Sequence, residues 1–76
     1  MTGSNGRVAI VGGCGHVGLP LGLAFASRGI EVVLYDVAER SVALVNDGVM
    51  PFDEPGAAEL LPTLIASGLL RASTSS

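Results

Sequence analysis

The stretch VAIVGGCGHVG, residues 8–18, decides the fold that we expect for this chain. It opens within a continuous apolar, β-branched run, Arg7 to Val11, which is typical of a parallel strand covered on both faces. Two glycines end that run. From His16 to about Arg28 the apolar residues then recur with helical spacing. The stretch therefore predicts a buried strand, a glycine-rich turn and a helix.

The predicted helix carries two different stripes. Gly18, Gly22 and Ala26 recur every fourth residue and have almost no side-chain bulk, so this stripe would let the helix backbone lie close to a sheet. A larger apolar stripe on the same helix consists of Val17, Leu21, Ala24 and Phe25. Such an apolar stripe is typical of the face that a helix turns toward the core.

Beyond the first helix, strand and helix patterns continue to alternate. The expected elements are a buried strand at 31–36, a helix at about 38–46, a loop at 50–56 with two prolines and a glycine, a helix at about 57–66 and a strand at 69–73. Alternating strands and helices imply a parallel sheet. The predicted fold is α/β: the first half of a Rossmann-type doubly wound parallel sheet, in the order β-α-β-α-loop-α-β, truncated at its third strand.

The composition excludes several classes of protein. The chain has 76 residues, of which 49% are hydrophobic and 14% charged, with a net charge of -3, so we expect no nucleic-acid partner. A single cysteine makes neither an internal disulfide nor a zinc site, and we expect no metal. No apolar run approaches the roughly 18 residues that span a bilayer. We therefore expect no membrane partner and a cytoplasmic location.

The glycines of the turn match the pattern G-x-G-x-x-G at Gly13, Gly15 and Gly18. The pattern is informative here because a buried strand precedes it and a helix follows it. In a dinucleotide-binding turn, the first glycine permits the tight bend, the second lets a pyrophosphate approach the backbone, and the third packs the helix onto the sheet. The helix N-terminus would offer unpaired N–H groups to the phosphates. A P-loop is excluded because no Gly-Lys-Ser/Thr follows.

Asp36 ends the second predicted strand, where an acid would accept hydrogen bonds from the adenosine ribose. A carboxylate there repels a 2′-phosphate, which favours NAD over NADP, although Arg40 lies close enough in sequence to approach a phosphate. The alternatives are a βα turn that binds nothing and an Asp36 that caps the next helix. One side chain could serve both roles.

Cys14 and His16 have side chains that are catalytic in many enzymes, but we assign neither of them a catalytic role. A helix N-terminus could lower the pKa of the Cys14 thiol, but a thiol here would collide with the pyrophosphate, so we expect a structural role. His16 is the only histidine, and no acid or nucleophile accompanies it in the sequence. We therefore predict that it lines the cofactor cleft and that the chain contains no catalytic residue.

Five segments of the chain resemble the UDP-glucose/GDP-mannose dehydrogenase family, the nucleotide-sugar 6-dehydrogenases. They are VAIVGGCGHVGLP (8–20), YD (35–36), VNDG (45–48), PFDEPG (51–56) and GLLRAST (68–74). The last two segments are the most specific, because a generic Rossmann chain needs neither. The resemblance implies an NAD-binding domain at 7–76, incomplete at its end, behind a disordered N-terminus at 1–6.

The same resemblance implies where the cofactor contacts lie. The pyrophosphate contacts implied are Gly13, Gly15 and Gly18 with the backbone of His16 and Val17. Asp36 would hold the adenosine ribose, with Arg40 as the nearest basic residue; Ser41 stands where the family often has lysine.

The family oxidises the C6 alcohol of a UDP- or GDP-linked sugar to a carboxylate with NAD, through a cysteine that lies far downstream of this region. The resemblance thus implies NAD as cofactor and a nucleotide-sugar substrate only in a full-length enzyme, whose oligomeric state stays open. The alternatives are the NAD-binding segment of a 3-hydroxy-acid dehydrogenase and a non-catalytic Rossmann remnant. For the chain alone we expect marginal stability and an exposed sheet edge at the third strand.

Overall fold

Three strands and three helices make up the part of the chain that the computed structural model describes, residues 6–75. In order they are β1 (Arg7–Val11), α1 (Gly18–Ala26), β2 (Glu31–Tyr35), α2 (Glu39–Asn46), α3 (Ala57–Ser67) and β3 (Leu70–Ser73). Every predicted element is present in the predicted order. The segment predicted to be disordered, residues 1–6, lies outside the described residues except for Gly6. None of these helices is long and apolar enough to cross a membrane.

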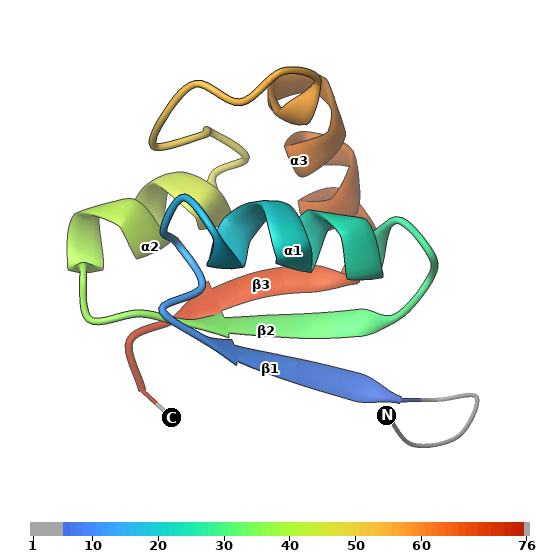
Figure 1. Ribbon diagram of the computed structural model, residues 1–76, viewed down its shortest axis with the longest axis horizontal. Coiled ribbons are helices and arrows are strands. Elements are labelled where there is room, and N and C mark those ends of the chain that lie inside the picture. The colour runs from blue at the N-terminus through green and yellow to red at the C-terminus, as the bar shows by residue number, and fades with distance from the viewer. Residues whose placement is uncertain (1–5, 76) are drawn as a thin grey trace.

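The strands form one parallel sheet in the order β1-β2-β3 (Figure 1). Val8 pairs with Val32, which in turn pairs with Leu70. Because neighbouring strands run in the same direction, their carboxyl ends meet at one edge of the sheet. The predicted half of a doubly wound α/β sheet is confirmed, and that edge is where the glycine-rich turn and Asp36 both lie.

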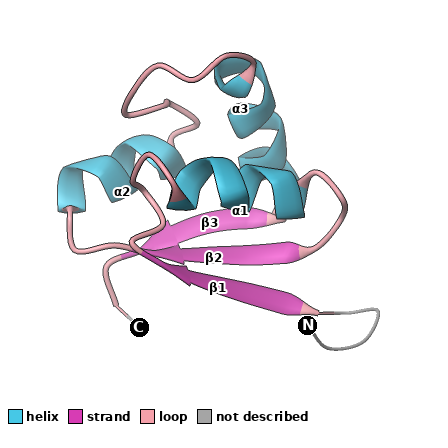
Figure 2. Ribbon diagram, in the orientation of Figure 1, coloured by secondary structure: helices cyan, strands magenta, loops and turns pink. Residues whose placement is uncertain are grey.

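All three helices lie on the same face of the sheet (Figure 2). Side chains therefore alternate along β1: Val8 and Ile10 pack against the core. Arg7, Ala9 and Val11 point the other way and are exposed, Val11 by 88%. The expectation of a first strand covered on both faces is wrong. An apolar run fits a buried strand, but the helices that follow it in this chain all cross the same face.

The free edge of β3 is paired by a side chain from α2. Asn46 donates a hydrogen bond from Nδ2 to the carbonyl of Ala72, and its Oδ1 accepts one from the Ala72 N–H, both at 2.8 Å. Toward the sheet interior, the N–H of Val32 donates to the Leu69 carbonyl at 2.7 Å. The outward N–H and C=O groups at Ala72 are thus satisfied, and the edge predicted to be exposed is blocked there.

The small-residue stripe of α1 faces the sheet as predicted. Gly18, Gly22 and Ala26 are buried. A Cβ atom added at Gly22 would lie only 2.7 Å from Cδ2 of Leu34 on β2. The absence of a side chain therefore lets α1 approach β2 closely, and this close approach holds the N-terminus of α1 beside the ends of the strands.

Only Phe25 of the larger apolar stripe of α1 packs against the core, contrary to the expectation for the whole stripe. Val17 is 81% exposed and Leu21 47% exposed. The large buried residues are Leu19 and Leu23, which follow the two glycines and so flank the contact with the sheet. Pro20 is the third residue of α1 and so lies in the first turn, where proline is tolerated because it interrupts no hydrogen bond within the helix.

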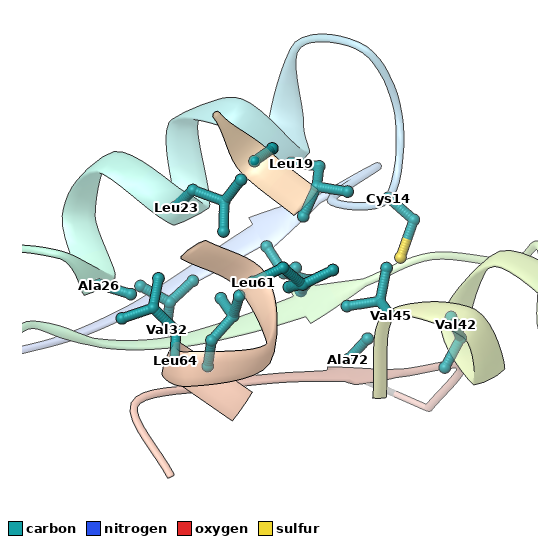
Figure 3. Close-up of a cluster of buried hydrophobic side chains, with 13 residues drawn as sticks. Cys14, Leu19, Leu23, Ala26, Val32, Val42, Val45, Leu61, Leu64 and Ala72 are labelled. Atoms are coloured by element: carbon teal, nitrogen blue, oxygen red, sulfur yellow. The ribbon is translucent and has the colours of Figure 1, made fainter. Parts of the chain in front are cut away.

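The core lies between the sheet and the helices (Figure 3). Its largest fully buried side chains are Leu19, Leu34, Leu61, Leu70, Val32 and Val45. Val42 and Val45 of α2 point inward as predicted, and α3 contributes Leu61 and Leu64. The core therefore ties β2 and β3 to all three helices and fixes the edge of the sheet that carries the site.

Candidate functional site

The turn between β1 and α1 is pinned to the end of β2. The N–H groups of Gly12 and Gly13 both donate to the carbonyl of Tyr35, at 2.8 and 3.1 Å, and the Gly15 N–H donates back to the Gly12 carbonyl at 3.2 Å. Gly12 has a φ of +73°, a left-handed conformation that favours glycine. The prediction that the tight bend falls at Gly13 is wrong. The bend falls one residue earlier, outside the G-x-G-x-x-G pattern.

Gly13 and Gly18 are required by packing within the chain. A Cβ at Gly13 would lie 2.6 Å from Cβ of Leu34, and one at Gly18 would lie 2.6 Å from the Gly12 carbonyl oxygen. A side chain at position 13 would push the turn away from β2. A side chain at position 18 would push α1 away from the turn. These two glycines therefore set the shape of the turn.

Gly15 is different, because nothing in the chain requires a glycine there. A Cβ at this position would contact only the Gly12 carbonyl oxygen, at 3.4 Å, and its φ lies outside the left-handed range. The space beside Gly15 is thus open toward the solvent side of the turn. Because packing within the described residues does not require a glycine at position 15, we interpret its bare backbone as a place where a ligand can approach closely.

Backbone donors without a partner follow Gly15 directly in the chain. Within residues 6–75, the N–H groups of His16, Val17 and Gly18 donate no hydrogen bond, whereas the Leu19 N–H already donates to the Gly15 carbonyl at 3.0 Å. They stand at the N-terminus of α1, where the helix dipole adds a positive partial charge. Unpaired N–H groups at a helix N-terminus are suited to bind a phosphate.

Asp36 follows β2 and reaches the turn. Its Oδ2 accepts a hydrogen bond from the Cys14 N–H, and its Oδ1 accepts one from the Ala38 N–H, both at 3.0 Å. Ala38 is the N-cap of α2, and α2 has no side-chain cap hydrogen bond, so the capping role considered for Asp36 is not present; the carboxylate instead bonds the residue just before the helix. A carboxylate offers about four lone pairs, and two remain for ligand hydroxyl groups. The acid and the glycine-rich turn are therefore parts of one site.

The Cys14 side chain points away from this site. The thiol is buried and extends toward Val45 of α2 (Figure 3). Burial, with a further contribution from the negative charge of Asp36, raises the pKa of the Cys14 thiol from 9.0 to about 11. The protonated thiol is a small core side chain, in agreement with the structural role that we expected.

His16 makes a contact that the sequence did not indicate. Its ring stacks on Phe52, with centroids 4.1 Å apart and ring planes inclined by 22°. Phe52 belongs to the loop between α2 and α3, which passes over the β1–α1 turn (Figure 1). The sequence shows that Phe52 belongs to the motif PFDEPG, but no local pattern specifies that its ring contacts His16.

Arg40, the second residue of α2, is exposed and takes part in no ion pair among the described residues. The described ion pair joins Arg7 and Glu31, 3.3 Å apart at the opposite ends of their strands from the site. Among the described residues, the structure therefore leaves the Arg40 guanidinium without an ion-pair partner in the first turn of α2.

A parallel strand, a glycine-rich turn, a closely packed helix and an acid at the end of the next strand define a Rossmann-type dinucleotide-binding unit. A family model described as "UDP-glucose/GDP-mannose dehydrogenase family, NAD binding domain" matches residues 6–76. The chain belongs to this family, and NAD is its cofactor. The resemblance seen in the sequence is confirmed.

Individual relatives agree with the family match. UDP-N-acetyl-D-mannosamine dehydrogenase of Escherichia coli K12 is 40% identical over 62 residues, 82% of this chain and 15% of that protein. UDP-glucose 6-dehydrogenase AglM of Haloferax volcanii is 45% identical over 62 residues, 82% of this chain and 14% of that protein. The chain thus spans about 15% of the length of the curated relatives it matches.

The structure is similar to a crystallised ternary complex of GDP-mannose dehydrogenase from Pseudomonas aeruginosa. The TM-score is 0.86 at 35% identity, over 91% of this chain and 16% of that chain. These relatives are nucleotide-sugar dehydrogenases, which favours that class over the 3-hydroxy-acid dehydrogenases considered as an alternative.

Proposed function

We propose that the chain binds NAD between the β1–α1 turn and the end of β2, as the cofactor-binding part of an enzyme that oxidises the C6 alcohol of a nucleotide sugar to a carboxylate. The observation that carries this proposal is Gly15, where the chain leaves open a space that a Cβ would occupy. That space adjoins the unpaired N–H groups of His16, Val17 and Gly18. A diphosphate fits both features, because it needs close approach and several donors.

Each proposed contact has a distinct task. The proposed contacts are Gly13, Gly15, His16, Val17, Gly18, Asp36 and Arg40, within an incomplete NAD-binding domain at 7–76. The backbone of the turn would bind the pyrophosphate, and the free lone pairs of Asp36 would accept hydrogen bonds from the adenosine ribose. The negative charge of Asp36 would repel a 2′-phosphate, and Arg40 would lie along the adenosine side of the site.

Within a longer enzyme, NAD would supply the hydride acceptor, and these residues would bind and orient it. We assign no catalytic residue to this chain: its one cysteine is buried beneath the turn with a raised thiol pKa, which suits packing and not nucleophilic attack. The nucleotide sugar would meet residues beyond this segment. We place such an enzyme in the cytoplasm, where a free cysteine such as Cys14 stays reduced.

Isothermal titration calorimetry with NAD and NADP tests the proposal, at a temperature where circular dichroism shows the chain folded. We expect NAD to bind and NADP to bind at least several-fold more weakly. The Gly15→Ala variant should keep the melting curve and lose NAD binding, because the added methyl group occupies the space meant for the pyrophosphate. Absence of NAD binding by the folded, unaltered chain would overturn the proposal.

A further inference from the structure

Phe52 joins the loop between α2 and α3 to the turn that we propose to bind pyrophosphate. Its ring stacks on His16 in a nearly parallel arrangement, with centroids 4.1 Å apart. His16 also carries one of the three backbone N–H groups at the N-terminus of α1 for which residues 6–75 provide no acceptor. The side chain of His16 is thus held on one side of the turn while its N–H stays free for a ligand.

The loop that carries Phe52 is itself well fixed. At its start Gly48 has a φ of +79° and packs on α3, where a Cβ would lie 3.2 Å from Cα of Pro62. At its end the Ala57 N–H donates to the Glu54 carbonyl at 3.0 Å as α3 begins. Phe52 and Met50 also pack, partly buried, against the core. Phe52 is therefore anchored to α3 and the core, independently of the turn.

The His16 side chain has few other contacts that fix its position. Gly12 and Gly13 are bonded to Tyr35, and Cys14 to Asp36, but no hydrogen bond of the described residues involves the His16 side chain. Its ring is exposed except for the contact with Phe52. The Gly15 and Val17 carbonyls accept hydrogen bonds from α1, and Gly18 packs on Gly12, so the stack is the contact that restrains the side chain of His16 between them.

From these contacts we infer that Phe52 is a positioning residue for NAD, although it lies 36 residues after His16 in the sequence, beyond α1, β2 and α2. It acts by holding His16 so that the N–H groups of the turn already point at the pyrophosphate before NAD arrives. Preorganised donors bind a ligand more tightly because less ordering remains to be done on binding. This inference rests on the proposed function, since it assigns a residue to the same cofactor site.

The test compares Phe52→Leu with Phe25→Leu, because Phe25 is the other phenylalanine and is also partly buried against the core, on α1. We expect Phe52→Leu to weaken NAD binding by about 3- to 10-fold, the amount that a stacked aromatic pair contributes. Phe52→Tyr should restore it, because the ring is kept. Phe25→Leu should lower the melting temperature and leave the affinity of the folded chain unchanged.

Two further measurements separate the outcomes. The chain has one histidine, so the ring protons of His16 are identified directly by proton NMR, and we expect an upfield ring-current shift that disappears in Phe52→Leu. In His16→Ala the Phe52→Leu change should cause no additional loss of affinity. Full NAD affinity in Phe52→Leu, or an equal loss in Phe25→Leu, would overturn the inference alone. Absence of NAD binding by the unaltered chain would overturn the proposed function and this inference with it.

Discussion

The backbone N–H of Cys14 donates a 3.0 Å hydrogen bond to Oδ2 of Asp36, across 22 positions in the sequence. The other oxygen of the same carboxylate accepts from the Ala38 N–H at the start of α2. One side chain therefore fixes the glycine-rich turn relative to β2 and holds the segment that leads into α2. Its role in the shape of the site is inseparable from its proposed contact with the ribose.

We expect Asp36→Asn to lower both stability and cofactor discrimination. An amide offers one acceptor oxygen where the carboxylate has two, so one backbone N–H loses its partner, and the free energy of unfolding should fall by about 1–2 kcal/mol. Loss of the negative charge should also bring the affinities for NAD and NADP closer together. Urea denaturation and calorimetry measure these effects. Asp47→Asn, the same charge change at the exposed C-cap of α2, should alter neither; an equal effect there would contradict the argument.

Stability should depend on the titration of Cys14 at alkaline pH. The pKa of its thiol is raised to about 11 in the folded chain from 9.0, chiefly by burial. Because the folded value lies above the unfolded one, the stabilisation is complete below pH 9 and is lost as the pH rises through 11. Urea denaturation from pH 7 to 11 should show this loss relative to Cys14→Ala, which has no thiol to titrate. Parallel pH curves for the two chains would rule it out.

Two glycines of the turn, two residues apart, should respond in opposite ways to alanine. At Gly13 the new Cβ would meet backbone and Cβ atoms of Leu34 at 2.6–2.8 Å, so the free energy of unfolding should fall by about 1–3 kcal/mol. At Gly15 the new Cβ has room, so stability should stay the same or rise by up to about 1 kcal/mol. Thermal melts distinguish the two variants. A large destabilisation by Gly15→Ala would show that the space beside Gly15 is needed by the fold itself.

Removal of the Asn46 side chain should expose the edge of β3. Asn46→Ala leaves the N–H and C=O of Ala72 without the two 2.8 Å bonds that now satisfy them. Unpaired edge groups invite strand pairing between chains, so sedimentation velocity should detect self-association that grows with concentration. Thr63→Ala, an exposed change on α3, is the control. A variant at Asn46 that stays monomeric at high concentration would argue against this protective role.

Much of the architecture was predictable because its signals are local. A β-branched run, a cluster of glycines and a helical repeat of small residues lie within 8–26, and each acts through neighbours in the sequence. The parallel order of the strands follows from their alternation with helices. The acid at position 36 was predictable for the same reason, since carboxyl ends of parallel strands share an edge. These features suffice to place the turn and Asp36 side by side.

Other features depend on contacts between distant segments, and no local pattern specifies them. The left-handed bend falls at Gly12 because its N–H and that of Gly13 both meet Tyr35 of the next strand. Val11 is exposed because α1, α2 and α3 all cross the opposite face of the sheet.

The stack of Phe52 on His16 and the pairing of Asn46 with Ala72 have the same origin. Chain order and residue spacing were enough for the strands, the helices and the motif, because their geometry repeats over a few residues. Which side chains meet across the fold was settled only when packing brought segments 20 to 40 residues apart into contact.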